Sequence, residues 1–492
     1  MLKALAATGW QRIGLAFGLG VLAAAGQAPV GWWWLAVPAF AGVIRLVARA
    51  NDVRTASLLA LFAGAGHFAA ALSWIVEPFL IDVARHGWMA PFAVVLLAFG
   101  LALFWAAAGA LSRFARSPAL GFAVALAATE LARGYVLTGF PWATPGHIWV
   151  DTPVAQIAAL IGPSGLTLVT LLAAALVATA RPDGAAAGAV VLALAAGFGL
   201  WRLNLPEPAP TGLTLRLVQP NAAQEAKWDP SNARVFFERQ LAYTAVRPLP
   251  DLTIWPETAV PYLLETSPEV AFVIADAAQG VPVALGVQRV EGQQYWNSLR
   301  VIAPDGQVSA TYDKHHLVPF GEYVPLADLA LDWFGIGAFA AQAGNGYSAG
   351  VGPVLLDLGP LGQVLPLICY EAVFPQIARE LESRPDWMLQ ITNDAWFGTL
   401  TGPYQHLAQA QLRAIEQGVP LARAANTGIS AMIDARGRIT ASLPLGQAGY
   451  VDVALPGALP QPIYARFGEW PLLVLLAGAG AGLFRSKRQG SA

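Results

Sequence analysis

Three apolar segments in the second half of the chain each end at residues that can do chemistry. The segment DLTIWP leads to Glu257, QVLPLI leads to Cys369, and WMLQIT leads to Asn393 and Asp394. In α/β proteins, sites assemble at the carboxyl ends of strands, because the strands fix the backbone while the following loops project side chains into a crevice. We therefore expect these residues to share a pocket.

Cys369 is the single cysteine of the chain and comes directly before Tyr370 and Glu371, where an apolar segment turns into a helical pattern. Backbone N–H groups and the helix dipole at such a position lower the pKa of a thiol, which predicts a nucleophile. A lone cysteine is also compatible with a small, inert, buried side chain. One cysteine excludes an intramolecular disulfide and a thiolate metal cluster.

Glu257 and Lys314 are candidates for a general base and a fixed positive charge. Glu257, in WPETAVPY, has apolar neighbours, so burial can raise its pKa towards the range that suits a general base. A helix N-terminal cap or a surface carboxylate is the alternative. Lys314, in YDKHHLVPFGEYVP, can stabilise an oxyanion because an ammonium needs no proton transfer to do so. A solvated surface lysine is the alternative there.

The sequence argues against metal, cofactor and nucleic-acid chemistry. His315 and His316 have no HxxxH, HExxH or carboxylate-rich partner motif, so we interpret them as structural and expect no metal. We interpret the sequence as lacking G-x-S-x-G, Walker and dinucleotide-binding glycine motifs, and we expect neither phosphoryl transfer nor serine-hydrolase chemistry. The net charge is -2, with no basic cluster before the last few residues, so nucleic acid is not an expected partner.

The elements that must position these residues are short strands and helices between Thr214 and about residue 456. Seven strand-like segments are bounded by turn signals: LTLRLVQP, DLTIWPE, VPVALGVQ, SLRVIAPDG, QVLPLICYE, DWMLQITND and ISAMIDARGRI. Helical patterns fall near 231–247, 267–279, 373–384 and 403–418. A region of this length suffices for one α/β core.

The first 210 residues are far less polar than this region. The whole chain is 56% hydrophobic and 12% charged, against roughly a quarter charged in an ordinary soluble domain. Eight apolar runs, most near the roughly 20 residues that cross a bilayer, occur at 13–28, 30–48, 55–76, 89–111, 118–138, 153–180, 186–203 and 467–484. We predict seven spans before the globular part and one after it. The first run is alternatively a cleavable signal peptide.

Lys and Arg residues in the short loops predict how the spans face. If the spans alternate, one side collects Lys3, Arg12, Arg45, Arg49, Arg54, Arg113, Arg116, Arg181, Arg485, Lys487 and Arg488. The opposite loops carry little besides Arg85. With the basic side in the cytoplasm, we predict a seven-helix transmembrane domain at 1–203, a catalytic domain on the outer face at 204–465, and a transmembrane helix with a basic cytoplasmic tail at 466–492.

Glu130 and Arg133 lie near the outer end of the fifth predicted span, three residues apart. At this spacing they can pair on one helix face, which lowers the free-energy cost of burying their charges. Such a pair either marks a function or serves helix packing, and the sequence leaves both open. The motif GFPW at 139–142 would cap this span.

Three motifs in order resemble the nitrilase superfamily. Glu257 in WPETAVPY, Lys314 in YDKHHLVPFGEYVP and Cys369 in LICYE look like its Glu-Lys-Cys triad. With the spans and the motifs GFPW, TNDAWFG and RAANTGIS, nearly the whole chain resembles the apolipoprotein N-acyltransferases of the bacterial envelope. The resemblance implies a multi-pass α-helical membrane domain joined to an α/β nitrilase-like domain, an αββα sandwich.

The resemblance also implies a role for each motif residue. Glu257 is then the general base, Lys314 the oxyanion-stabilising cation and Cys369 the nucleophile. Further residues are implied in support of the site, Glu322 and Glu371, and in substrate binding, Trp228, Tyr370 and Arg423. It implies no metal and no cofactor.

The reaction implied is an acyl transfer in lipoprotein biosynthesis, at the inner membrane, with the catalytic domain on the periplasmic face. A phospholipid gives its acyl chain to Cys369 as a thioester intermediate, and the N-terminal amine of the diacylglyceryl-cysteine of an apolipoprotein then takes it, in ping-pong order. The apolar segment 326–344 is expected to dip into the bilayer as a lid, or alternatively packs on the core as an ordinary loop.

Two other functions remain open at this point. A membrane-tethered amidase or nitrilase would use the same triad on a small amide, with water as the acyl acceptor. A transporter with a fused binding domain would place ionisable groups at the bilayer midplane or show repeat-related broken helices. The clearest internal charges here lie near one edge of a span and no repeat is visible, which counts against the transporter.

Overall fold

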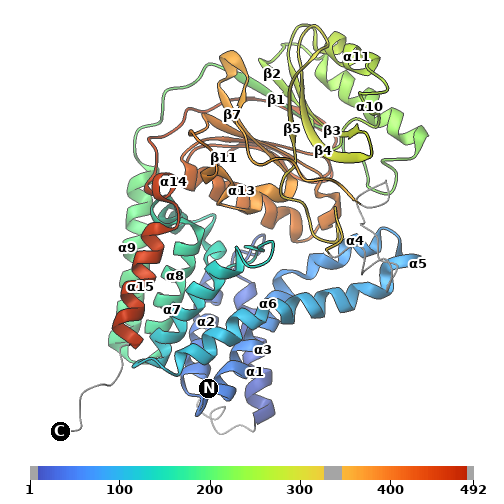
Figure 1. Cartoon of the computed structure of the whole chain (residues 1–492). Coiled ribbons are helices and arrows are strands. Elements are labelled where there is room, and N and C mark those ends of the chain that lie inside the picture. Colours follow the sequence, from blue (N-terminus) through green and yellow to red (C-terminus); the bar gives the residue numbers. More distant parts are fainter. Residues whose placement is uncertain (1–8, 326–345, 485–492) are drawn as a thin grey trace, which may run out of the picture. The chain divides into compact units, whose positions relative to one another are not determined.

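The computed structural model describes residues 9–325 and 346–484. The apolar segment 326–344, Lys3 and the basic tail with Arg485, Lys487 and Arg488 lie outside these ranges. Residues Met1–Leu205 together with Gln461–Ala492 form one compact unit, and Pro206–Pro460 form a second (Figure 1).

The first unit is helical, and a helix overlaps each of the eight apolar runs. These helices are α1 (Gly9–Ala24), α2 (Trp33–Ala48), α3 (Val53–Ala71), α6 (Ala90–Ser112), α7 (Pro118–Arg133), α8 (Ala158–Ala178), α9 (Pro182–Leu203) and α15 (Trp470–Phe484). Three short helices accompany them, α4 (Glu77–Leu80), α5 (Val83–His86) and α14 (Ile463–Phe467). Within the described residues, four helical segments are long and apolar enough to cross a membrane: Val53–Ala71, Val83–Ser112, Pro153–Ala178 and Pro182–Leu203. The helices Trp33–Ala48 and Trp470–Phe484 are apolar but shorter.

The predicted pair on α7 forms. Arg133 Nη2 lies 2.6 Å from Glu130 Oε2, with both side chains almost fully buried. Trp105 Nε1 of α6 donates a hydrogen bond to Glu130 Oε1 at 3.0 Å. A buried charge is tolerated only when it is paired and hydrogen-bonded, and this carboxylate meets both conditions.

The same cluster holds the backbone that follows α7. Side chains from three separate segments reach consecutive parts of it: Arg133 Nη1 donates to Phe140 O, His67 Nε2 lies 2.8 Å from Ala143 O, and Gln27 Nε2 donates to Thr144 O at 3.0 Å. The residues around GFPW are therefore fixed by buried polar groups of the helical unit. This observation favours a structural role for the pair.

The second unit contains two six-stranded sheets. In one sheet the strand order is β12-β1-β2-β3-β4-β5, and in the other it is β11-β10-β9-β8-β7-β6. The strands of the first sheet are β1 (Thr214–Gln219), β2 (Leu252–Ile254), β3 (Val283–Glu291), β4 (Gln294–Ile302), β5 (Val308–Asp313) and β12 (Gly449–Ala454). Those of the second are β6 (Leu356–Asp357), β7 (Gln363–Ile368), β8 (Trp387–Thr392), β9 (Leu421–Ala425), β10 (Ser430–Ile433) and β11 (Ile439–Leu443). The central strands are parallel in both sheets, β1 to β3 and β7 to β9.

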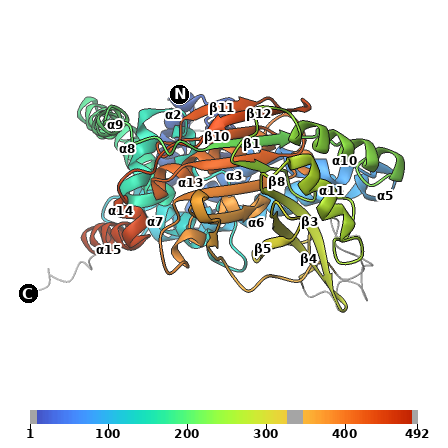
Figure 2. The same cartoon turned by 90° about the horizontal axis from the view of Figure 1, so that it is seen from above.

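The sheets pack face to face with helices outside them (Figures 1 and 2). One apolar core lies between the sheets and takes residues such as Leu217 and Ile254 from the first and Leu389 from the second. Helices α10 (Pro230–Thr244) and α11 (Glu269–Ala278) cover the first sheet through a second core that includes Phe237 and Ile274. Helix α13 (Gly402–Gln417) packs against β9 and β10. The expected αββα sandwich is confirmed.

One predicted helix is wrong. Residues 373–384 form no α-helix, and the chain makes two short 3₁₀ turns nearby, Cys369–Val373 and Ile377–Arg379. The reason is Pro375, because a proline disfavours helical geometry in the residue before it. Phe374 is accordingly extended, with φ -99° and ψ 109°. The turn after β7 therefore stays short.

Candidate active site

Glu257 lies in the turn that follows β2 and is 6% exposed. Its Oε1 accepts a hydrogen bond from Asn297 Nδ2 at 2.6 Å, and its Oε2 accepts one from the backbone N–H of Asn393 at 2.8 Å. Burial raises the pKa of Glu257, and the charge of Glu322 adds to this effect while Lys314 opposes it. The residue is neither a helix cap nor a surface carboxylate, and its raised pKa suits a general base.

A close approach of β3 fixes the backbone at Glu257. A Cβ atom placed on Gly286 would lie 2.6 Å from Glu257 Cα and 2.5 Å from Thr258 N, so this position admits only glycine. The backbone N–H of Ala259 donates to Gly286 O at 2.8 Å. Thr258 has φ +46°, an unusual value for a residue with a branched side chain. The turn is therefore held in one tight conformation.

Lys314 directly follows β5 and is 1% exposed. Its Nζ lies 2.8 Å from Glu322 Oε2 and 3.7 Å from Glu257 Oε1. Burial acts to lower the pKa of Lys314, but the carboxylates of Glu322 and Glu257 outweigh it and raise the pKa above its usual value. The ammonium is thus a permanent positive charge beside the carboxylate of Glu257, as an oxyanion-stabilising group requires.

Cys369 begins the 3₁₀ turn after β7, is 5% exposed and has φ +52°. The sequence predicted a lowered pKa for its thiol. Burial, followed by the charge of Glu257, instead raises the pKa of Cys369, against the opposing charge of Lys314. The expectation fails because a single 3₁₀ turn offers little helix dipole, whereas full burial strongly disfavours a thiolate. The thiol is protonated at rest and needs a base.

Two buried side chains contact the backbone carbonyl of Cys369. Gln390 Nε2 donates to it at 3.3 Å, and His406 Nε2 lies 3.0 Å from it. His406 Nδ1 lies 3.0 Å from Asp394 Oδ1. These contacts support the left-handed backbone conformation of the cysteine.

The two supporting carboxylates lie in different places. Glu322 belongs to the site, because its Oε1 accepts hydrogen bonds from Lys314 Nζ and Asn297 Nδ2, both at 2.9 Å. Glu371 is fully buried and accepts hydrogen bonds from the backbone N–H of Ile368 at 2.7 Å and of His315 at 2.9 Å. Burial acts to raise the pKa of Glu371, but the hydrogen bond and charge of His315 outweigh it and lower the pKa. Glu371 therefore ties the end of β7 to the segment after β5.

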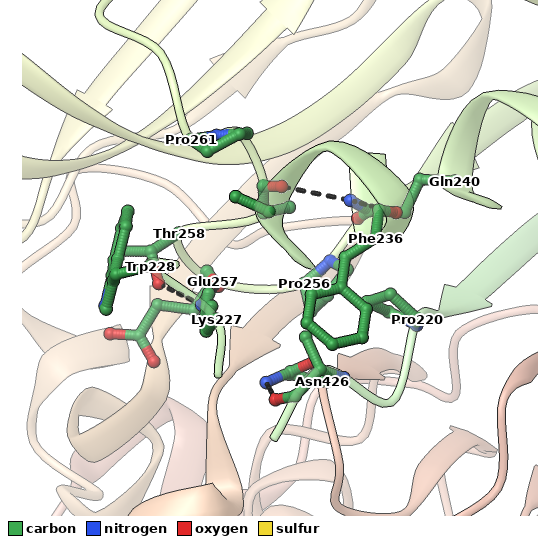
Figure 3. A pocket seen from close by; sticks show the side chains of 13 residues that line it. Pro220, Lys227, Trp228, Phe236, Gln240, Pro256, Glu257, Thr258, Pro261 and Asn426 are labelled. Atoms are coloured by element: carbon green, nitrogen blue, oxygen red, sulfur yellow. Dashed lines mark hydrogen bonds between the residues drawn. The ribbon is translucent and has the colours of Figure 1, made fainter. Parts of the chain in front are cut away.

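The three expected substrate-binding residues also lie in different surroundings. Trp228 lines a narrow pocket beside Glu257 (Figure 3). Tyr370 is 5% exposed, and its ring lies 4.8 Å from that of Phe374. Arg423 is fully buried, and its Nη2 donates to Asp394 Oδ2 at 2.5 Å. Arg423 thus reaches no surface and acts on its neighbours in the core.

Several polar residues of the site gave no signal in the sequence. Asn297 lies inside β4 and bridges Glu257 and Glu322. Lys227 lies beside Glu257 in the same pocket as Trp228. The sequence shows only an asparagine within a strand-like segment and a lysine before a tryptophan, and neither pattern predicts a role in the site.

One serine motif contradicts the expectation that the chain has none. Residues 346–350 read GYSAG and fit the G-x-S-x-G pattern, which needs a sharp turn between a strand and a helix. Residues 346–355 contain neither a strand nor a helix, so Ser348 does not occupy such a turn. Within the described ranges no group of three or more His, Cys, Asp or Glu residues could hold a metal ion.

The arrangement supports covalent acyl chemistry. Glu257 can take the thiol proton, the sulfur can attack a carbonyl carbon, and Lys314 can stabilise the oxygen that becomes negative. The strand ends of both sheets contribute, since Glu257 and Lys314 follow strands of the first and Cys369 follows a strand of the second.

Two regions of the chain match known families. Residues 19–176 match the apolipoprotein N-acyltransferase N-terminal domain, and residues 217–461 match the carbon-nitrogen hydrolase family. Among solved structures, a CN-hydrolase superfamily protein from Xanthomonas campestris is 20% identical with a TM-score of 0.37, covering 55% of this chain and 94% of that one. An amidase from Nesterenkonia sp. is 19% identical with a TM-score of 0.38, covering 55% and 98%.

Full-length relatives are much more similar. An apolipoprotein N-acyltransferase of Caulobacter vibrioides is 39% identical over 507 residues, covering 96% of this chain and 94% of the relative. Those of Allorhizobium ampelinum and Rhodopseudomonas palustris are each 37% identical and cover 96% of this chain. Such identity across both units shows that this chain belongs to the apolipoprotein N-acyltransferase family, acyltransferases with a carbon-nitrogen hydrolase domain.

Proposed function

We propose that this chain transfers an acyl chain from a phospholipid to the N-terminal amine of the diacylglyceryl-cysteine of an apolipoprotein, through a thioester on Cys369. The observation that carries the proposal is the buried interaction of one thiol, one carboxylate and one ammonium, Cys369, Glu257 and Lys314, in a member of this family. Family membership does not support the transporter interpretation, and the amidase interpretation has less support than acyl transfer.

The first half-reaction loads the enzyme. Glu257 accepts the proton of the Cys369 thiol, and the sulfur attacks the ester carbonyl carbon of the phospholipid. Lys314 stabilises the oxyanion that forms. When the carbon–oxygen bond breaks, Glu257 returns the proton to the leaving oxygen and the lysophospholipid departs. The enzyme then carries an acyl thioester, and Glu257 is ionised again.

The second half-reaction transfers the acyl group from Cys369 to the acceptor. The amine of the acceptor attacks the thioester carbonyl, Glu257 takes a proton from the attacking nitrogen, and the carbon–sulfur bond breaks. The thiolate regains its proton from Glu257, and the amide product leaves. Because Glu257, Lys314 and Cys369 are 6%, 1% and 5% exposed, bulk water has little access to the thioester, which supports transfer over hydrolysis.

The supporting residues have different roles in this proposal. Glu322 fixes the ammonium of Lys314, and Glu371 fixes the turn that carries Cys369. Trp228 and Tyr370 are proposed to contact substrate. Arg423 is proposed to govern backbone position through Asp394, because its side chain is fully buried.

The helical unit gives the site access to its substrates. Both substrates carry acyl chains, and exposing them to water costs about 0.8 kcal/mol per CH₂. A catalytic domain joined to membrane helices avoids this cost. We propose the division predicted above, with membrane helices at 1–203, the catalytic domain at 204–465 on the periplasmic face of the inner membrane, and a further span and basic tail at 466–492.

Intact-protein mass spectrometry tests the proposal. After incubation with a defined phospholipid, the wild-type chain is expected to gain the mass of one acyl chain, and Cys369→Ala is expected to gain none. A synthetic diacylglyceryl-cysteine peptide is then expected to remove the adduct and appear as an N-acylated peptide. If no adduct forms while a simple amide is hydrolysed, the amidase is the correct function and acyl transfer is wrong.

A further inference from the structure

Lys227 lies in the turn between β1 and α10, and its ammonium is buried against the Glu257–Thr258 turn (Figure 3). Its Nζ donates hydrogen bonds to Thr258 Oγ1 at 2.6 Å and to the backbone carbonyl of Glu257 at 3.2 Å. The residue is 6% exposed. The acyl-transfer steps described above make no use of it.

The choice of lysine is unusual in this chain. Only four of the 29 basic residues are lysines, Lys3, Lys227, Lys314 and Lys487. The two that lie in the described ranges, Lys227 and Lys314, are both buried and both act electrostatically on Glu257. A compact ammonium with three rotatable donors suits two closely spaced oxygens, whereas the planar guanidinium of arginine does not.

The charges around Glu257 show why a second cation is needed. Lys314 lies closer to Glu322, at 2.8 Å, than to Glu257, at 3.7 Å. Burial and the like charge of Glu322 both favour the protonated form of Glu257, and that form cannot accept a proton from the thiol. With Lys227 counted, two buried carboxylates face two buried ammonium groups.

Burial of this ammonium is itself unfavourable. It lowers the pKa of Lys227 to about 8, with Glu257 as the opposing influence. A neutral donor could satisfy a hydroxyl and a carbonyl oxygen without the desolvation penalty of a buried charge. The positive charge therefore needs a purpose beyond hydrogen bonding, and the acidic group that interacts with it is Glu257.

We propose that Lys227 is a positioning residue for the general base: its ammonium fixes the Glu257–Thr258 turn and keeps the carboxylate of Glu257 ionised until the thiol gives up its proton. The inference rests on the proposed role of Glu257. Its mechanical part follows from the two hydrogen bonds to the turn in which Thr258 adopts φ +46°. Its electrostatic part follows from the second buried positive charge.

The electrostatic part predicts a direction. The charged groups that face Glu257 are Lys227, Lys314, Glu322 and the thiol of Cys369 when ionised. Lys227 lowers the pKa of Glu257, so loss of its charge raises that pKa. The acid limb of any rate that needs ionised Glu257 then moves to higher pH. Above about pH 8 the wild-type ammonium itself deprotonates, and the difference between wild type and variant shrinks.

Alkylation of Cys369 by iodoacetamide in the full-length, detergent-solubilised protein measures this effect directly. The chain has one cysteine, so the mass increase reports one site, and no lipid substrate is required. Rates are compared between about pH 5 and about pH 9 for wild type, Lys227→Met, Glu257→Gln and the double variant. Arg239→Met is the matched control, because Arg239 donates to the backbone carbonyl of Pro220 on the neighbouring turn but does not act on Glu257.

We expect Lys227→Met to move the acid limb to higher pH and to slow alkylation at pH values on that limb, about tenfold for each pH unit of the shift. In the Glu257→Gln background the same substitution is expected to change nothing further, because coupled residues do not act additively. Arg239→Met is expected to keep the wild-type profile. If Lys227→Met does not fold, Lys227→Gln carries the test, since it keeps a donor and removes only the charge.

Two results would overturn the inference. One is an equal loss of rate at every pH with no shift of the acid limb. The other is an undiminished effect of Lys227→Met in the Glu257→Gln background. A different result, in which Glu257→Gln itself leaves alkylation unchanged, would remove Glu257 as the base and refute the mechanism proposed for acyl transfer.

Discussion

Burial drives the thiol of Cys369 and the carboxyl of Glu257 towards their neutral forms. When the thiol passes its proton to the carboxylate of Glu257, the net charge inside the site does not change. A free thiolate would also be more prone to oxidation than the thiol, since susceptibility follows thiolate character. In the proposed mechanism the thiol therefore becomes a nucleophile only as Glu257 takes its proton.

This protonation pattern sets the pH dependence of acyl loading. In the proposed mechanism the active form of Glu257 is the ionised form, so we expect the rate to be retained above its pKa and to fall as the pH drops through it. Burial raises the pKa of Glu257, which places the acid limb above the ordinary glutamate value of about 4.3. We expect single-turnover thioester formation, followed by intact mass, to show this limb.

Glu257→Gln checks the assignment. It is expected to slow thioester formation by about 10²-fold to 10⁴-fold and to remove the acid limb. Glu238→Gln serves as the control, because Glu238 lies in an exposed ion pair on α10. A Glu257→Gln enzyme that keeps the wild-type acid limb would show that another group is the base.

At the same scale, the sequence predicted Glu257, Lys314 and Cys369 as catalytic residues and Glu322 in support, but it gave neither Asn297 nor Lys227. Glu257 and Cys369 could be recognised because each follows an apolar strand within a known motif. Asn297 and Lys227 could not, because their partners lie 40 and 30 residues away in the chain. The pKa of Cys369 was predicted in the wrong direction because burial, which decides it, is a tertiary property.

At the scale of elements, the site depends on strand ends from two sheets. β2 and β5 position Glu257 and Lys314, whereas β7 positions Cys369. Their alignment therefore depends on the apolar core between the sheets. The sequence predicted β2 and β7 from their apolar pattern, but β6, β9 and β12 lie outside the predicted segments. β9 (Leu421–Ala425) is only five residues long and has Arg423 at its centre, so its apolar pattern is weak.

Arg423 provides the prediction at this scale. Its Nη2 pairs with Asp394 Oδ2 at 2.5 Å, with both side chains fully buried. Arg423→Met leaves the carboxylate of Asp394 without its main partner, and such a loss costs about 3–5 kcal/mol of unfolding free energy. We expect a clearly lower thermal unfolding midpoint in detergent and an unchanged acid limb of thioester formation.

The pH dependence of stability has a defined sign here. Burial acts to raise the pKa of Asp394, but Arg423 and His406 outweigh it and lower the pKa to about 2. Because the folded-state pKa is lowered, this stabilisation is present above the ordinary carboxyl pKa of about 4 and is lost as the pH falls towards 2.

A second substitution is the control for Arg423→Met. Asp394→Asn in the Arg423→Met background is expected to recover part of the lost thermal unfolding midpoint. A full-stability Arg423→Met with impaired donor binding would instead support direct substrate contact.

At the scale of the whole molecule, composition alone separates the two units. The apolar runs each overlap a helix, and the polar half forms the αββα sandwich. What the sequence could not supply was the path of residues 139–144, which depends on side chains from separate segments, among them His67 and Gln27. Those contacts arise only when the helices pack.

The orientation of the catalytic unit in the membrane gives the last prediction. Basic residues gather in alternate loops of the helical unit, including Arg49 and Arg54 on either side of the turn before α3. The cytoplasmic side of a membrane protein carries such residues in excess. We therefore predict that the catalytic unit, which follows seven predicted spans, lies on the outer face.

Two single-cysteine variants test it in the Cys369→Ala background, which has no other cysteine. Glu291→Cys places a thiol on the catalytic unit, where the Glu291 side chain is 76% exposed, and Asn51→Cys places one at an exposed position in the basic loop. In intact spheroplasts, a membrane-impermeant maleimide is expected to label Glu291→Cys at once and Asn51→Cys only after permeabilisation. The reverse pattern would place the thioester chemistry inside the cell, where an exported apolipoprotein could not reach it.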